Sequence, residues 1–150
     1  CDYRSSIGAT EYERVGIFVR DDGHGNFDAS SSSSNVKGGN NYLMTYDTNS
    51  GLIRVGMMLN GVKTEFITPI SSQTSLWMKF KINCNGPYIT YYLDDAPIVT
   101  VTDTIHSHGY YGIGYHEYFT SNFNIQGTIV DRFMVDQAIT NSVRNWEILD

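Results

Sequence analysis

The fold of this chain is decided by residues 76–102, LWMKFKINCNGPYITYYLDDAPIVTVT. Apolar and polar residues alternate along this stretch, which is typical of half-buried β-strands. The alternation predicts three strands: Leu76–Asn83, Tyr88–Asp94 and Ile98–Thr102. Asn85-Gly86 joins the first two, and Asp94-Asp95-Ala96-Pro97 joins the second pair, so both connections consist of residues that favour tight turns. The stretch therefore predicts consecutive antiparallel strands joined by hairpins.

The same alternation recurs on both sides of this stretch, whereas helical periodicity is hard to find. It predicts six more strands: Arg14–Arg20, Tyr42–Asp47, Leu52–Leu59, Val62–Ile67, Tyr110–Tyr118 and Gly127–Val135. Asn60-Gly61 is the strongest short hairpin signal, because a type I′ turn needs positive φ at both positions. Residues 21–41 read as a long surface loop, and residues 137–150 as a last strand or a short helix. Many strands joined by tight turns predict an all-β antiparallel sandwich.

Composition excludes several other classes of protein. Of the 150 residues only 17% are charged and 13% are aromatic, which is unlike a disordered chain. No stretch resembles the ~20 apolar residues of a membrane span. The net charge is −6 without any cluster of Lys or Arg, so nucleic acid is a poor candidate partner. Many tyrosines on a thinly charged chain favour an extracellular or cell-surface location.

The cysteines and the chain ends leave two points open. Cys1 and Cys84 form either one disulfide or two free thiols. There is no initiating Met and no signal peptide, so the chain is either a mature product or an excised piece. We expect residues 1–150 to be one domain and a fragment of a longer protein.

The order of strands and turns resembles a known family. The residues that carry the resemblance are Trp77-x-Lys79-x-Lys81-Ile82, Ile89–Asp95, Val99–Asp103, Gly109–Gly114, and upstream Gly16–Arg20 and Tyr42–Met44. In that order they resemble concanavalin A-like lectin/glucanase domains, above all the laminin-G-like jelly rolls of bacterial carbohydrate-active proteins. The resemblance covers most of residues 14–136. It implies a concanavalin A-like jelly roll, and it says little about activity, because one fold serves many functions.

Catalysis finds little support in the sequence. Glucanases of this fold carry E-x-D-x-x-E on one strand, and no such motif occurs here; Glu11 and Glu13 share a face only near a strand start. A polysaccharide lyase would use Tyr or His as its base, and Tyr115, His116 and Tyr118 lie on one predicted strand. Spacing alone does not bring these residues together with an arginine.

Binding fits the residues better, because sugar rings stack on aromatic side chains while their hydroxyls need polar partners. Alternation places nine residues in the core: Ile53, Val55, Met57, Met78, Phe80, Ile82, Ile89, Tyr91 and Leu93. The opposite face then carries Arg20, Tyr42, Tyr46, Arg54, Trp77, Lys79, Lys81, Tyr92, His116 and Arg132. From this set we expect a carbohydrate platform built from Trp77, Tyr92, Tyr46, Arg54, Arg20 and His116. The competing interpretation is that these are ordinary residues of a β-surface.

One loop is a candidate cation site. Asp21, Asp22, Asn26 and Asp28 lie within eight residues, and Ca²⁺ prefers such oxygen ligands. The spacing is not that of an EF-hand, and Asp and Asn also favour turns for backbone reasons. A structural Ca²⁺ and an ordinary turn both remain open, and the four histidines show no zinc spacing.

The sequence thus favours a non-catalytic, lectin-like carbohydrate-binding module of a secreted or cell-surface bacterial protein. Its expected partners are a polysaccharide or glycan and other domains of a parent protein. The alternative is a protein-interaction or structural laminin-G-like domain, in an adhesin or a filament. A glycoside hydrolase or polysaccharide lyase comes third.

Overall fold

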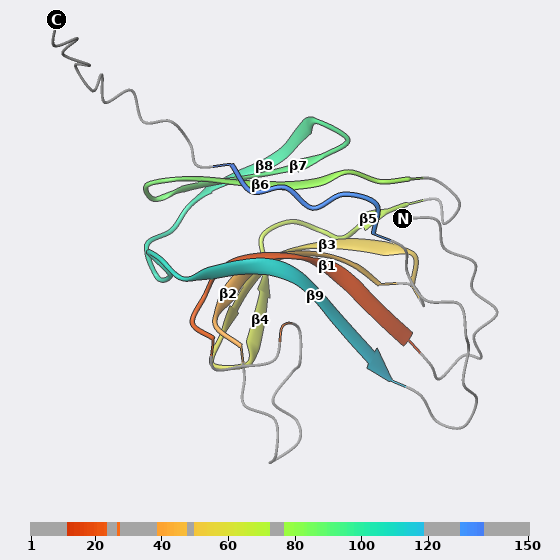
Figure 1. Cartoon of the computed structure of the whole chain (residues 1–150), viewed down its shortest axis with the longest axis horizontal. Coiled ribbons are helices and arrows are strands. Elements are labelled where there is room, and N and C mark those ends of the chain that lie inside the picture. Colours follow the sequence, from red (N-terminus) through yellow and green to blue (C-terminus); the bar gives the residue numbers. More distant parts are fainter. Residues whose placement is uncertain are drawn as a thin grey trace, which may run out of the picture.

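Two antiparallel sheets pack face to face and form a β-sandwich (Figure 1). The computed structural model describes residues 12–23, 27, 39–47, 50–72, 77–118 and 130–136. Its strands are β1 (Tyr12–Asp21), β2 (Asn41–Asp47), β3 (Leu52–Leu59), β4 (Val62–Glu65), β5 (Ile70–Ser71), β6 (Phe80–Asn85), β7 (Tyr88–Leu93), β8 (Ala96–Thr102) and β9 (Tyr110–Tyr118). Within the described residues there is no helix long and apolar enough to span a membrane. The predicted all-β antiparallel sandwich is confirmed.

The larger sheet has six strands, in the order β4-β3-β2-β1-β9 with β5 also paired to β3. The smaller sheet has the order β6-β7-β8, which is the meander predicted from residues 76–102. The larger sheet bends over its width, so that the face turned away from the smaller sheet is concave (Figure 1). We call this surface the concave face.

The core lies between the sheets. Its fully buried side chains are Tyr42, Met44 and Tyr46 of β2, Ile53 and Val55 of β3, and Ile89 and Tyr91 of β7. All nine residues predicted for the core belong to this cluster or pack against it. Burial of one such large side chain contributes about 1.5–3 kcal/mol.

The prediction for Tyr42 and Tyr46 is wrong. Both were expected on the outer surface, and both are buried in the core. Every residue of β2 is buried, since the strand is central in its sheet and covered on both faces. The Tyr42 hydroxyl finds partners inside: it donates to Asp103 Oδ1 at 2.6 Å and accepts from the backbone N–H of His106 at 3.2 Å. Burial together with the Asp103 bond raises the pKa of Tyr42 to about 12.

The hairpin turns follow the predicted chemistry. Asn60 and Gly61 have φ of 52° and 76°, as a type I′ turn requires, and Asp94 and Asp95 have φ of 50° and 66°. The turn between β6 and β7 is Gly86-Pro87 and not the predicted Asn85-Gly86, because Asn85 still pairs with Tyr88. Gly86 has φ of 56°, as the first central residue of a type II′ turn requires.

One predicted strand end moves for a packing reason. The fourth strand ends at Glu65 instead of Ile67, because Phe66 turns into the core and lies 6.5 Å from Tyr42 and 6.0 Å from Tyr91 between ring centroids. The sixth strand begins at Phe80 instead of Leu76.

The strand predicted at Gly127–Val135 is not formed in its described part. Residues 130–136 form no strand and join no β-ladder of the described residues, and all of them are exposed (Figure 1). Their apolar residues fall on both sides of the chain, so neither side offers a continuous apolar face to a sheet. The interpretation of residues 137–150 as a strand or helix lies outside the described residues.

Cys84 of β6 is a free thiol, and Cys1 lies outside the described residues. Burial raises the pKa of the Cys84 thiol above its ordinary value. Because the thiolate is the reactive form, this position is unsuited to a nucleophile.

Candidate functional site

The six residues predicted to bind a ligand lie on different surfaces of the sandwich. Tyr92 belongs to the outer face of the smaller sheet, opposite the core-facing Tyr91, and Trp77 is exposed in the segment that precedes β6. Arg54 lies on the concave face of the larger sheet, and Tyr46 is in the core. One ligand cannot contact both outer surfaces, so the predicted set does not form one site.

The other two predicted residues hold parts of the fold together or are only partly described. Arg20 donates from Nη1 to the carbonyl of His106 at 3.0 Å and from Nη2 to the carbonyl of Gly86 at 2.7 Å. Its guanidinium therefore ties two loops to the end of β1. His116 pairs with Arg14 in the register of β9 and β1, and its side chain lies outside the described residues.

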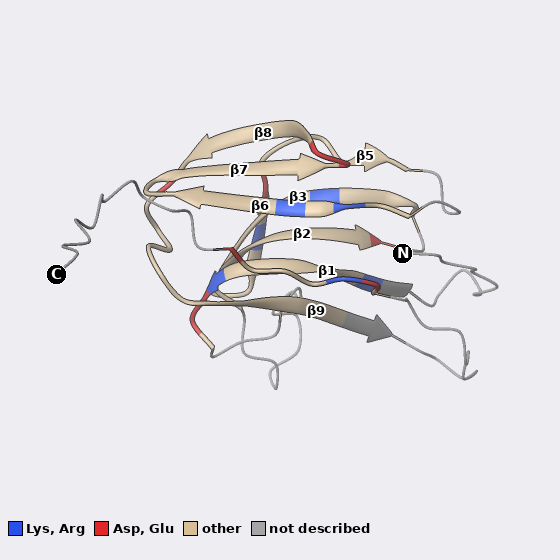
Figure 2. Ribbon diagram, turned by 45° about the horizontal axis from the view of Figure 1, so that its top comes forward, with Lys and Arg blue, Asp and Glu red and all other residues tan. Residues whose placement is uncertain are grey.

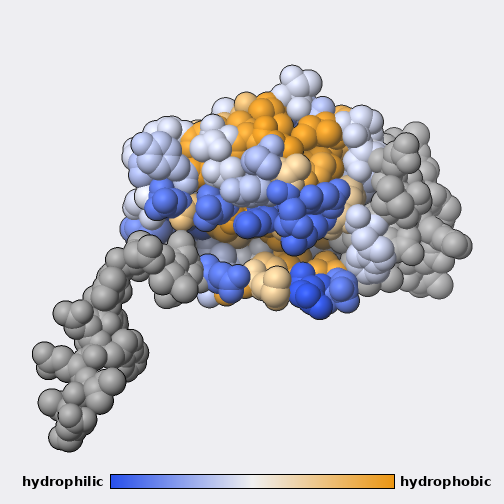
Figure 3. All heavy atoms as spheres, turned by 90° about the horizontal axis from the view of Figure 1, so that it is seen from above, coloured by the Kyte–Doolittle hydropathy of each residue, from blue (hydrophilic) through white to orange (hydrophobic). Residues whose placement is uncertain are grey.

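The outer face of the smaller sheet combines aromatic and cationic groups. Trp77 is 57% exposed, and the Lys81 ammonium lies 4.7 Å from the centroid of the Tyr92 ring. Beside them, Thr90 and Thr100 share a hydrogen bond of 3.0 Å between their hydroxyls. Viewed from above, a row of hydrophilic side chains crosses this side of the molecule next to an apolar area (Figure 3). Because Lys81 lies over the Tyr92 ring, that ring is less available for stacking than Trp77.

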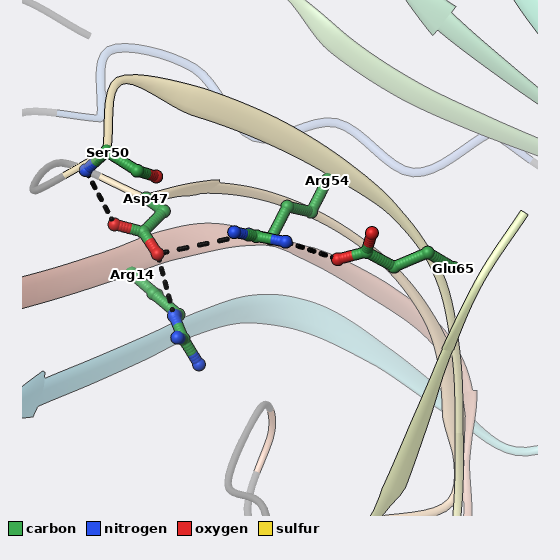
Figure 4. A network of polar contacts seen from close by, with 5 residues as sticks. All are labelled: Arg14, Asp47, Ser50, Arg54 and Glu65. Atoms are coloured by element: carbon green, nitrogen blue, oxygen red, sulfur yellow. Dashed lines mark hydrogen bonds and ion pairs between the residues drawn. The ribbon is translucent and has the colours of Figure 1, made fainter. Parts of the chain in front are cut away.

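A line of alternating positive and negative side chains crosses the concave face (Figure 4). Arg14 donates from Nε to Asp47 Oδ2 at 3.2 Å, and Arg54 Nε lies 3.9 Å from the same oxygen. Arg54 also donates from Nη1 to Glu65 Oε1, and the other oxygen of Asp47 accepts the N–H of Ser50 at 3.1 Å. We call Arg14, Asp47, Arg54 and Glu65 the arginine–carboxylate cluster. Its side chains are between 8% and 30% exposed, so solvent reaches them.

Strand register explains why these side chains meet. Arg14 on β1 faces Asp47 on β2 directly, and Thr45 on β2 faces Arg54 on β3. The contacts of Arg54 with Asp47 and Glu65 are diagonal ones, which long side chains can span. The strand of Arg14, β1, and the strand of Arg54, β3, thus lie on the two sides of β2 (Figure 2).

Hydrogen-bonding capacity remains unused beneath the cluster. Thr45 is fully buried and its Oγ1 has no hydrogen-bond partner. The Nε of Arg54, on the residue that faces Thr45, also lacks a hydrogen bond, since Asp47 is too far away at 3.9 Å. Buried polar groups are nearly always hydrogen-bonded, so two unbonded polar atoms on facing residues are unusual.

Glycines form part of the floor of this face. A Cβ at Gly16 would collide with the backbone oxygen of Met44, and a Cβ at Gly56 with that of Thr64. Gly16 pairs with Thr45, so no side chain stands over β1 at that position. Further along, the ring of Phe27 lies over Gly114, where a Cβ would overlap it. The arginine–carboxylate cluster therefore lies over a floor with few side chains.

Two of the four predicted cation ligands are described, and both hold the loop that follows β1. Asp21 accepts from the N–H of Gly23 at 2.7 Å and from Asn41 Nδ2 at 2.8 Å, and Asp22 accepts from Asn40 Nδ2 at 2.6 Å. Asn26 and Asp28 lie outside the described residues. In the described part of the chain, three or more His, Cys, Asp or Glu nowhere come together as a metal site.

The cluster escaped the sequence analysis except for Arg54. Assigning Tyr42 and Tyr46 to the surface put Thr45 and Asp47 on the inner face, because strand residues alternate. The alternation of residues in β2 could have revealed it. Polar Thr45 and Asp47 lie on one face of the strand, and Tyr42, Met44 and Tyr46 lie on the other.

Comparisons with known proteins give one partial likeness. No protein-family model matches the chain, and no curated protein matches it either. Among solved structures, the carbohydrate-binding module CBM66 from Bacillus subtilis is similar, with 20% identity and a TM-score of 0.44. The alignment covers 71% of this chain and 66% of that chain, which is just under two thirds of the latter. A likeness of this degree does not identify a ligand.

Proposed function

We propose that this chain is a non-catalytic carbohydrate-binding module, and that its ligand lies on the concave face over the arginine–carboxylate cluster. The observation that carries the proposal is the unused hydrogen-bonding capacity of Thr45 Oγ1 and Arg54 Nε beneath a solvent-reached line of donors and acceptors. A sugar hydroxyl both donates and accepts, so it can bond to a guanidinium and a carboxylate at once.

The balance of charge suggests a neutral glycan. Arg14 and Arg54 carry two positive charges, and Asp47 and Glu65 carry two negative ones, all within one chain of contacts. An ionic ligand would disturb this balance, whereas adjacent hydroxyls of a neutral sugar can insert between the paired groups. Charge-assisted hydrogen bonds of this kind contribute about 1.5–3 kcal/mol each.

Binding suits the carboxylates better than hydrolysis does. A glycosidase needs one carboxyl that gives a proton to the glycosidic oxygen and a second that acts as base or nucleophile. Asp47 and Glu65 both contact Arg54. We therefore expect no release of reducing ends from polysaccharides.

The exposed Trp77 makes the outer face of the smaller sheet the competing site for the same function. Its 57% exposure is high for a tryptophan, and an indole is a good stacking surface for a sugar ring. This side of the molecule offers two exposed aromatic rings, those of Trp77 and Tyr88, whereas the concave face offers several convergent polar groups, which selective sugar binding needs.

The proposal also covers the fold family of the domain and its cellular location. The strand order through Trp77, Tyr92 and the Gly112–Gly114 strand supports a concanavalin A-like jelly roll of the laminin-G-like kind. The many tyrosines and few charges support action outside the cell, as a lectin-like part of a secreted or surface protein, bacterial in origin.

The test is binding of the chain to a microarray of neutral plant, fungal and bacterial polysaccharides, followed by titration calorimetry on the best ligand. Arg54→Gln should weaken binding about 10–100-fold, which is the loss of one or two charge-assisted bonds. Thr45→Val should weaken binding about 3–10-fold without lowering Tm, because it removes a hydroxyl that is unsatisfied in the free protein.

Arg132→Gln is the matched control, since Arg132 is exposed and lies outside the cluster. It should leave affinity unchanged. Loss of binding in Trp77→Ala, with Arg54→Gln unaffected, would move the site to the outer face of the smaller sheet. Absence of binding to every polysaccharide on the array would contradict the proposed function itself.

A further inference from the structure

The strand β9 carries a row of large apolar side chains that remain exposed in the single chain. Tyr111, Ile113 and Tyr115 are 57%, 40% and 46% exposed. They lie on the core side of the larger sheet, because Ile113 pairs with Ile17 and Tyr115 with Val15, and both partners pack in the core. The smaller sheet, whose β6 packs against β1 and β2, therefore leaves the row on β9 largely uncovered.

The position of β9 in its sheet is a second, independent observation. It is an edge strand, and among the described strands it pairs with β1 alone (Figure 2). Natural edge strands are usually protected by lysine, proline or another charged residue, and none of these occurs between Tyr110 and Tyr115. A long, apolar edge without such protection is a template for the addition of another strand.

We propose that two copies of this chain join their larger sheets edge to edge, through antiparallel pairing of β9 with β9. The partner is a second copy because the strand is complementary to itself. A two-fold axis at Ile113 pairs this residue with its own copy and places Tyr111 opposite the partner's Tyr115. Cross-strand pairs of aromatic and β-branched side chains stabilise a sheet. On the other face, Gly112 lies opposite the partner's Gly114, so no side chains collide there.

The distribution of charge favours the same register. Glu117 is the one residue in the sequence of β9 with a full charge at neutral pH, and the axis at Ile113 sets its position opposite the partner's Gly109. Like charges are thus not opposed across the new pair of strands. Moving the axis to Gly114 would instead bring Glu117 opposite the partner's Tyr111, within the apolar row.

The dimer has one continuous sheet with both concave faces on the same side, because the axis that relates the two antiparallel strands stands perpendicular to the sheet. The contact is isologous and closed, so it leaves no β9 edge free for further copies. Two arginine–carboxylate clusters that face the same way would hold one polysaccharide at two points, which raises avidity. The dimer itself depends on β9 and not on carbohydrate binding.

The first experiment is sedimentation equilibrium of the full chain over a range of micromolar concentrations. The wild-type chain should show twice the mass of one chain, falling toward that of a single chain on dilution. Tyr111→Lys should be monomeric and keep the β-sheet circular dichroism of the wild type, because a lysine on an edge opposes pairing and Tyr111 is exposed in the single chain. Tyr88→Lys is the matched control, since Tyr88 on β7 is 56% exposed, and it should remain dimeric.

A cysteine at the axis tests the register. Ile113→Cys, made together with Cys1→Ser, sets two thiols on directly opposed residues whose Cα atoms lie about 4.5–5.5 Å apart, within reach of a disulfide. Mild oxidation should link this variant into a covalent dimer, whereas Tyr88→Cys in the same background should stay unlinked. A wild-type chain that is monomeric at every concentration would overturn the proposal and assign the edge to another partner or another part of this chain. A dimer that survives Tyr111→Lys, or that Ile113→Cys does not link, would overturn it as well.

Discussion

At the scale of single residues, tyrosine hydroxyls are built into the core. Tyr42 donates to Asp103 at 2.6 Å, and Tyr91, fully buried on β7, donates to the carbonyl of Gly56 across the sandwich at 3.0 Å. Burial raises the pKa of both hydroxyls, that of Tyr42 to about 12. The Tyr42 hydroxyl bonds the larger sheet to the segment after β8, and the Tyr91 hydroxyl bonds the smaller sheet to the larger one. A phenol can donate these hydrogen bonds only while it is protonated.

The raised pKa of Tyr42 predicts a loss of stability in alkali. The unfolded chain loses this proton near pH 10, whereas the folded chain keeps it until about pH 12. The free energy of unfolding should therefore be unaffected below pH 10 and fall between pH 10 and 12, by at most about 1.4 kcal/mol per pH unit from this group. Urea unfolding followed by tryptophan fluorescence at several pH values measures the slope.

Tyr42→Phe is the comparison that isolates this group, because lysines and other tyrosines titrate in the same range. The variant should be less stable at pH 8, since Asp103 loses a hydrogen bond, and should show a shallower decline above pH 10. Equal slopes in both proteins would mean that Tyr42 does not contribute.

Residue-scale prediction from sequence failed where a strand is covered on both faces. Alternation was sufficient for β6 and β7, because Lys81 and Thr90 mark the outer side and Ile82 and Ile89 the inner side. In β2 both phases are buried, so the pattern carries no such contrast. Tyrosine, which is common on surfaces and in cores, was then assigned to the wrong phase.

At the scale of elements, turn chemistry was the most predictable part of the chain. Positive φ at Asn60, Gly61, Asp94 and Asp95 is what the two hairpins need, and these turns fix the register of the strands they join. The end of β4 was less predictable, because Phe66 leaves the strand for a contact with the other sheet. Such a contact is set by tertiary packing, which a local pattern does not contain.

Substitutions at two glycines distinguish the cost of an unfavourable backbone conformation from the cost of a steric clash. Gly86→Ala should fold and lose about 1–2 kcal/mol, because φ is 56° while nothing lies within 4 Å of the new Cβ. Gly16→Ala should fail to fold, because its Cβ would meet the backbone oxygen of Met44. Thermal unfolding and circular dichroism measure both. Equal losses from the two substitutions would contradict this distinction.

At the scale of the whole molecule, the sandwich has two outer surfaces with different chemistry. The concave face carries paired charges over a glycine-containing floor, and the outer face of the smaller sheet carries the Tyr92 ring beneath the Lys81 ammonium. The sequence predicted that aromatic and arginine residues face outward, and this holds for Trp77 and Arg54. It did not predict that they face opposite ways, because the pairing of distant strands into two sheets decides that.

The arginine–carboxylate cluster depends on the same long-range pairing. Arg14, Asp47 and Glu65 come from β1, β2 and β4, and they meet through the registers of three strand pairs. No short motif joins them in sequence. Sites of this kind become visible only after the strands have been placed in order.

The most direct test of carbohydrate binding on the concave face is NMR titration of the ¹⁵N-labelled chain with the best polysaccharide fragment from the array. The backbone amides of Gly16, Thr45, Arg54 and Gly56 should shift in proportion to bound ligand, while those of Lys81, Thr90 and Tyr92 stay in place. Shifts confined to Lys81, Thr90 and Tyr92 would contradict the central claim and put the ligand on the smaller sheet.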